Sequence, residues 1–117
     1  MSDRQMVMVG FMQAQNCSNY PASWRHSESA GDFMSPAYYQ RIARALEDGK
    51  FHLGFFDDRL AMPDIYGADH AESVRNGVRV VKMDPIPILA TMAMGTKCLG
   101  LAATCSTTYY FISRGHS

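Results

Sequence analysis

The sequence predicts an α/β fold with a parallel sheet, in the order strand, helix, strand, helix, strand. Three observations support this prediction. Short apolar runs alternate with two segments that carry helix start and stop signals. The runs are almost continuously apolar, which is typical of parallel strands buried on both faces. Both strand-to-helix connections are long and both helix-to-strand connections are short, and in α/β folds the loops after the strands build the ligand site.

The first strand is expected within residues 5–13 (QMVMVGFMQ), an apolar run of strand length. A first helix is expected over 35–49, because Ser35 can act as N-cap, Pro36 suits the first helical position and Gly49 ends the pattern. The spacing predicts that its apolar face consists of Tyr38, Ile42, Ala45 and Leu46.

The second strand is expected over 51–57 (FHLGFFD), and a second helix over 84–97, with Asp84 as N-cap and Pro85 at the first helical position. A third strand begins near Leu99. Two completions fit this order, a small doubly wound sheet and the opening third of a (β/α)8 barrel. The first strand-to-helix connection contains no GxGxxG or GxxxxGK[ST] pattern, which weakens the nucleotide-binding alternatives and favours the barrel.

Composition narrows the class of protein. The chain of 117 residues is long enough for one modest domain, and its formal net charge of zero gives no electrostatic reason to expect a nucleic-acid or membrane partner. Its apolar runs are shorter than the roughly 20 residues of a membrane span. The three cysteines show no CxxC spacing, which predicts reduced thiols in a cytoplasmic protein and no zinc site.

Asp57 and Asp58 end the second predicted strand. Because side chains alternate along a strand, one carboxylate should face the site and the other should lean toward helices or solvent. They are therefore not expected to act as an acid/base pair. A third carboxylate at suitable spacing is missing, since Asp64 and Asp69 follow in an irregular loop, and this disfavours a magnesium or calcium site. A ligand contact and a structural role at the strand end both remain open.

Other candidates lie after the third strand and in the first long loop. Thr104 and Ser106 should share one face, where their hydroxyls suit a polar ligand. Cys105 has no adjacent base and is expected to be a small core residue. The loop residues are Trp24, Arg25 and His26, of which Trp24 could anchor the loop or line an apolar pocket and His26 could reach a substrate or remain solvated.

Three segments, MQAQNCSNYPASWRHSES, FFDDRLAMPD and KMDPIPILATMAMGTKCLGLAATCSTTYY, together resemble one family. It is the luciferase-like, FMNH2-dependent monooxygenases of the nitrilotriacetate monooxygenase component A, pristinamycin synthase and dibenzothiophene-sulfone monooxygenase group. The resemblance extends from about Gly10 to Tyr110. It implies a (β/α)8 barrel and a two-component oxidoreductase that oxygenates a small organic substrate with O2. It also implies reduced FMN supplied by a separate NAD(P)H-dependent flavin reductase, and a homo-oligomer.

The resemblance also implies roles for particular residues. Asp58 matches the acid after the second strand that contacts the flavin, so that Asp58 would face the flavin and Asp57 would turn away. Thr104 matches a residue after the third strand near the FMN ring, and Ser106 is a weaker match. Three residues are expected on the substrate side, namely Trp24, Arg25 and His26. No catalytic residue and no metal ligand are assigned.

Two departures from the family lead to further expectations. A complete barrel needs about 250 residues, so residues 1–110 are interpreted as the N-terminal part of a truncated barrel with little or no activity of its own. The alternatives are a non-catalytic remnant and a small α/β binding domain. Residues 111–117 (FISRGHS) do not resemble the family, but a shifted reading of their codons can spell the expected continuation, which suggests a frameshifted gene.

Overall fold

The computed structural model describes residues 4–16, 20, 22–29, 31–59 and 61–105. The predicted order of strands and helices is confirmed. The main elements are β1 (Val9–Gln13), α1 (Pro36–Asp48), β2 (Leu53–Asp57), α3 (Pro85–Ala93) and β3 (Gly100–Ala103). The long loops contain three short helical segments that the sequence did not predict, η1 (Ser23–Arg25), η2 (Tyr66–Ala68) and α2 (Ala71–Arg75).

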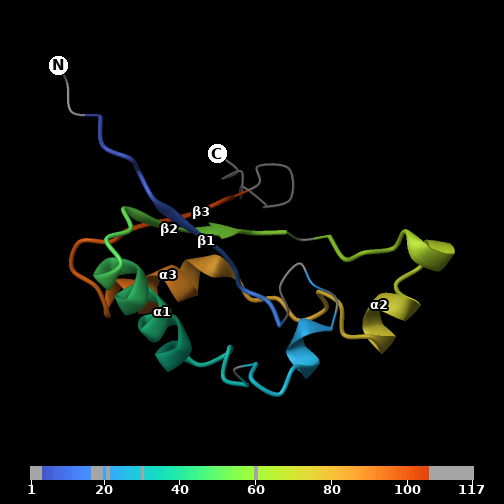
Figure 1. Ribbon diagram of the computed structural model, residues 1–117. Coiled ribbons are helices and arrows are strands. Elements are labelled where there is room, and N and C mark those ends of the chain that lie inside the picture. Colours follow the sequence, from blue (N-terminus) through green and yellow to red (C-terminus); the bar gives the residue numbers. More distant parts are fainter. Residues whose placement is uncertain (1–3, 17–19, 21, 30, 60, 106–117) are drawn as a thin grey trace, which may run out of the picture.

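The three strands form one parallel sheet in the order β1-β2-β3. The parallel pairing is as predicted, and it places the carboxyl ends of β1 and β2 side by side, with Gln13 opposite Asp57. Both α1 and α3 cover the same face of this sheet (Figure 1). The long loops leave from the carboxyl ends of β1 and β2, so the structure has the loop asymmetry that the sequence predicted.

Local signals set the ends of both main helices. The Ser35 hydroxyl accepts a hydrogen bond from the backbone N–H of Tyr38, and the Asp84 carboxylate accepts one from that of Ile86, which confirms both predicted N-caps. The helix α1 ends at Asp48, as Gly49 predicted, whereas α3 ends at Ala93 and is shorter than expected. The strand β1 is also shorter than the apolar run that predicted it.

The hydrophobic core lies between the sheet and the two helices. Its buried centre includes Ala43, Phe56 and Met92, each with no exposed surface, together with Tyr39 and Ile88. The predicted apolar face of α1 is therefore partly wrong. The most buried residues of this helix are Tyr39 and Ala43, because these two face the sheet and α3, whereas the predicted residue Ala45 is exposed.

The opposite face of the sheet is uncovered, which corrects the expectation of strands buried on both faces. Val9 is 46% exposed and Phe11 is 56% exposed, and Phe11 contacts Phe55 across the strand pair, with ring centroids 5.9 Å apart. On the helix side, Gly10 allows α1 to approach β1 closely, since a Cβ atom there would lie 2.7 Å from the Leu46 side chain. The sheet therefore has one packed face and one open apolar face.

The loop after β2 extends away from the sheet, and α2 lies far from the strands along it (Figure 1). The chain then returns to the sheet at the segment before α3. Within the described ranges, no helix combines the length and the apolar character that crossing a bilayer would require.

Candidate functional site

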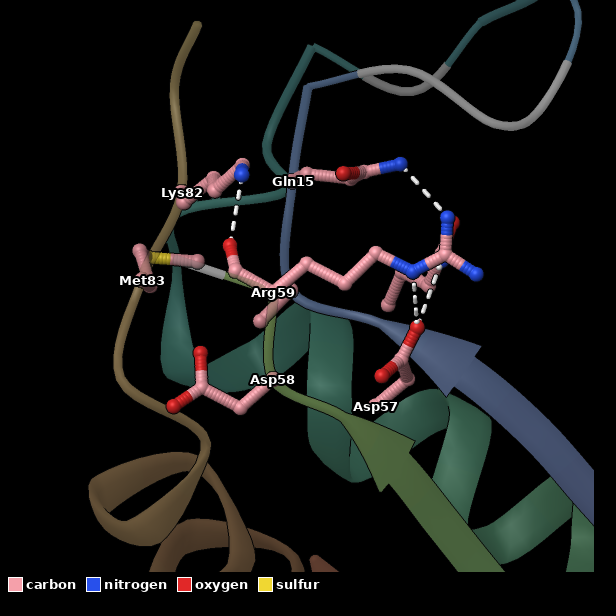
Figure 2. Close-up of a pocket in the computed structure, with 8 residues that line it drawn as sticks. Gln15, Asp57, Asp58, Arg59, Lys82 and Met83 are labelled. Atoms are coloured by element: carbon pink, nitrogen blue, oxygen red, sulfur yellow. Dashed lines mark hydrogen bonds and ion pairs between the residues drawn. The ribbon is translucent and has the colours of Figure 1, made fainter. Parts of the chain in front are cut away.

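A small pocket lies where the chain leaves β1 and β2, at the carboxyl edge of the sheet (Figure 2). The segment before α3 closes one side of it. Its lining comes from three parts of the chain that are distant in sequence, namely Gln13 to Gln15, Asp57 to Arg59, and Lys82 with Met83. This is the edge at which ligand sites of α/β proteins are built.

A short antiparallel pairing brings the third of these parts to the pocket. Gln15 and Lys82 form an isolated β-bridge. The backbone N–H of Met83 donates to the carbonyl of Ala14 at 2.8 Å, and the backbone N–H of Asn16 donates to the carbonyl of Val81 at 3.2 Å. Residues 81–83 are therefore a strap across the loop that follows β1, and they carry Lys82 to the end of β2.

Asp57, the last residue of β2, belongs to a polar cluster on the open face of the sheet. Its Oδ2 atom accepts hydrogen bonds from Gln13 Nε2 at 3.2 Å and from Arg59 Nε at 2.6 Å. The strand register places Gln13 directly opposite Asp57, on the side that carries Phe11. Asp57 is thus an ion-paired carboxylate, of which 19% of the side chain is exposed.

Asp58 points away from Asp57, toward Lys82 and Met83, as the alternation of side chains predicted (Figure 2). The two carboxylates therefore lie on different sides of the strand end, and Asp57 is the one on the open face. Asp58 Oδ2 is buried and has no hydrogen-bond partner among the described residues. Burial raises the pKa of the Asp58 carboxyl, and the nearby negative charge of Asp84 raises it further.

Thr104 and Asp58, two of the predicted flavin-binding residues, lie next to each other. The backbone N–H of Asp58 donates to Thr104 Oγ1 at 2.8 Å, and the backbone N–H of Thr104 donates to the carbonyl of Phe56 at 3.0 Å. The third predicted residue, Ser106, lies outside the described residues. Cys105 is exposed rather than part of the core, because β3 has already ended at Ala103.

Lys82 connects the strap to the loop after β2. Its Nζ atom donates hydrogen bonds to the carbonyl oxygens of Arg59 and Ala61, each at 2.5 Å. Burial lowers the pKa of the Lys82 ammonium, the positive charge of Arg79 lowers it further, and Asp58 acts in the opposite direction. The sequence did not single out Lys82, because no local pattern shows which carbonyl oxygens a distant lysine will reach.

The three residues expected on the substrate side do not line this pocket. Trp24 Nε1 donates to the carbonyl of Asn76 at 3.2 Å, and its ring packs on Gly77, whose φ of +63° and close approach leave no room for a side chain. The Arg25 guanidinium lies over the Trp24 ring, 4.9 Å from its centroid. His26 Nδ1 accepts a hydrogen bond from the backbone of Glu28. Trp24 therefore joins two loops, as expected if it anchors its loop rather than lines an apolar pocket.

Two further residues of the site were not found from the sequence. Gln13 contacts Asp57, and Asn16 holds the carbonyl of Gly77 through its Nδ2 atom while its buried Oδ1 atom has no partner among the described residues. The position of Gln13 at a strand end was the only available signal. The described residues contain no group of three or more His, Cys, Asp or Glu side chains that could hold a metal ion.

Parallel strands with long loops and polar side chains at their carboxyl ends define a protein of the (β/α) barrel class. No family model matches the sequence. Dibenzothiophene-sulfone monooxygenase of Rhodococcus erythropolis is 46% identical over 108 residues, which are 92% of this chain and 24% of that protein. Long-chain alkane monooxygenase of Geobacillus thermodenitrificans is 35% identical over 97 residues, which are 80% of this chain and 22% of that protein.

Solved structures agree with these relatives. Long-chain alkane monooxygenase (LadA) superposes with a TM-score of 0.84 at 30% identity, over 92% of this chain and 25% of that one. Riboflavin lyase (RcaE), solved with a modified FMN and its substrate riboflavin, superposes with a TM-score of 0.80 at 27% identity, over 92% and 24%. The chain is therefore a homologue, over nearly all of its residues, of luciferase-like, flavin-dependent monooxygenases, and it spans about a quarter of the length of these relatives.

Proposed function

We propose that this chain carries a flavin-contacting part of an FMNH2-dependent monooxygenase of the two-component type. Reduced FMN would come from a separate NAD(P)H-dependent flavin reductase in the cytoplasm, and the reaction would use O2 to oxygenate a small organic substrate. The observation that carries the proposal is the juxtaposition of Asp58 and Thr104 at the carboxyl edge of the sheet, where Asp58 Oδ2 is buried and has no partner among the residues that the structure describes.

The polar atoms at this edge suit a flavin. One buried acceptor of the pocket, Asp58 Oδ2, lacks a hydrogen-bond partner among the described residues, and such an atom costs free energy until a donor reaches it. A reduced flavin carries N–H donors on its ring and hydroxyl donors on its ribityl chain, so it can supply one. When bound, the reduced flavin supplies the electrons for reaction with O2, and the protein supplies position and electrostatics.

Each residue would have a limited task. Asp58 would accept a hydrogen bond from the flavin, and its position depends on Thr104, whose oxygen holds the Asp58 backbone N–H. Thr104 and Ser106 are proposed as further flavin contacts through their hydroxyl protons. Arg25 and His26 are exposed and could contact a substrate, whereas Trp24 keeps their loop in place on Gly77.

Anaerobic titration of the chain with FMNH2, followed by flavin absorbance, tests the proposal. We expect saturable binding and a loss of affinity of about tenfold or more in D58A, because one good hydrogen bond to a charged group contributes roughly this much. D64A is the matched control, since Asp64 is an exposed acid in the same long loop. Absence of binding, or an equal loss in both variants, would contradict the proposal.

A second candidate function is a non-catalytic chain, and the open apolar face of the sheet favours it. Val9 and Phe11 are exposed there, so the described residues do not by themselves enclose a reaction site from water. An assay with a flavin reductase, NADH, FMN, O2 and dibenzothiophene sulfone separates the two candidates. Product formation above the reductase-only control supports the monooxygenase, and bound FMNH2 without product supports the non-catalytic chain.

The expectations about residues 1–110 as an N-terminal barrel portion and 111–117 as a shifted reading frame stay predictions. Residues 111–117 lie outside the described residues. Sequencing of the locus tests the frameshift, and an unshifted frame through these codons would contradict it.

A further inference from the structure

We infer that Lys82 is a positioning residue for Asp58: it fixes the backbone that follows Asp58 and thereby holds the Asp58 carboxylate toward the proposed flavin site. The inference rests on the proposed function and extends it to a residue of the segment before α3. Three groups of contacts support it. The first holds the backbone after Asp58, the second holds the Asp58 backbone N–H, and the third holds the backbone that carries Lys82.

The first group fixes the chain just after Asp58. Lys82 Nζ donates to the carbonyl oxygens of Arg59 and Ala61, each at 2.5 Å, so one ammonium group holds two backbone positions shortly after β2 ends. Hydrogen bonds with a charged donor are stronger than those between neutral groups, and Lys82 is partly buried. These two bonds therefore restrict the backbone immediately after the Asp58 carboxylate.

The second group fixes Asp58 on its β3 side. Its backbone N–H donates to Thr104 Oγ1, and Thr104 is itself bonded to the carbonyl of Phe56 in β2. With the backbone held from both sides, the carboxylate has less freedom, although its Oδ2 atom has no hydrogen-bond partner in the part of the chain that the structure describes. An acceptor that is held in place without a partner is preorganised for a ligand donor, because the ligand does not have to order it.

The third group fixes Lys82 itself. Lys82 pairs with Gln15 in the β-bridge, and the neighbouring backbone of Val81 and Met83 is bonded to Asn16 and Ala14. The loops after β1 and after β2 and the segment before α3 therefore meet at Lys82 (Figure 2). The backbone that carries the Lys82 ammonium is therefore held in place.

The charge of Lys82 acts in the same direction as its hydrogen bonds. The groups that influence Asp58 are Asp57 and Asp84, whose negative charges oppose its ionisation, and Lys82, whose positive charge favours it. Arg59 and Arg79 are the further cations near Lys82. Without Lys82 the Asp58 carboxylate would be less restrained, and the negative charge of Asp84 near it would be less compensated.

A double-mutant cycle on FMNH2 affinity tests the inference, with the variants K82M, D58A and K82M/D58A. Met keeps most of the apolar stem of Lys82 and removes its charge and donors. We expect K82M to weaken binding about tenfold in the wild-type background and less than twofold in the D58A background, because the effect acts through the Asp58 side chain. K50M is the matched control, since Lys50 is exposed at the other end of the sheet, and K82R should keep affinity within about threefold of wild type. An equal loss in both backgrounds would overturn the inference.

A second measurement needs no flavin, so it tests the inference even if the proposed function is wrong. Amide hydrogen exchange of the Asp58 N–H, which is bonded to Thr104 Oγ1, should accelerate at least tenfold in K82M and remain unchanged in K50M. Thermal melts identify any variant that does not fold, and K82Q, which also removes the charge, then replaces K82M in the comparison with wild type. If the wild-type chain binds no FMNH2, the proposed function fails, and the inference is decided by exchange alone. Unchanged protection of Asp58 in K82M would overturn it.

Discussion

At the residue scale, Asp58 is a group whose placement opposes folding. Burial and the charges of Asp84 and Asp57 raise its pKa above the ordinary value of 3.8, and one of its oxygens lacks a partner among the described residues. A carboxyl whose pKa is raised in the folded state adds stability only while it is protonated, and this contribution is lost as the pH rises through the raised pKa. Such a group is retained for a ligand more readily than for stability.

The variant D58N should therefore be at least as stable as wild type at neutral pH, because it removes a charge that is partly desolvated and near two like charges. The difference should shrink as the pH falls below 3.8, where the wild-type carboxyl is protonated in both states. Thermal melts of both proteins across this pH range measure the effect. A melting temperature of D58N that is clearly lower at neutral pH would contradict it and would indicate a structural role for the carboxylate.

At the element scale, the carboxylate of Glu47 ties α1 to the chain that enters β3. Its Oε1 atom accepts hydrogen bonds from three consecutive backbone N–H groups, those of Lys97, Cys98 and Leu99, at 2.9, 2.5 and 3.2 Å. These bonds, led by that from Cys98, lower the pKa of the Glu47 carboxyl below its ordinary value of 4.5. The entry to β3 is therefore held by a charge on a different element.

We predict that E47Q melts at a lower temperature than wild type at neutral pH. A lowered pKa means that the ionised carboxylate stabilises the folded state above pH 4.5 and that this contribution is lost as the pH falls through the lowered pKa. The two melting temperatures should therefore converge in acid. D48N serves as the control, because Asp48 is the exposed neighbour of Glu47 on α1. A difference that persists unchanged at low pH would refute the electrostatic explanation.

The elements that could be predicted from the sequence are those specified by neighbouring residues. Ser35 and Asp84 cap helices within a few residues of their own positions. The apolar character and the length of the runs at β1 and β2 are enough to predict strands there. The alternation of Asp57 and Asp58 was likewise a local property. The strap at Lys82 and the Glu47 contacts join residues that are far apart in the chain, so no spacing in the sequence indicated them.

At the scale of the whole molecule, the chain has one well-packed layer and one face without cover. The radius of gyration is 17.1 Å, whereas a globular domain of this length would have about 13 Å. The extended loop after β2 and the open sheet face both contribute to this difference (Figure 1). In a closed barrel this face would point to the interior and be filled by side chains of other strands. The stability of the chain should therefore depend on the helix side of the sheet alone.

Two phenylalanines on opposite faces of the sheet test that dependence. Phe56 has no exposed surface and contacts Tyr39 of α1, so F56A should lower the free energy of unfolding by about 3–5 kcal/mol. Phe11 is 56% exposed on the open face, so F11A should cost less than about 1 kcal/mol. Urea unfolding of both variants, at two protein concentrations, measures the difference. A loss in F11A as large as that in F56A would show that the open face is buried in solution, and a midpoint that rises with concentration would identify a second copy of the chain as its cover.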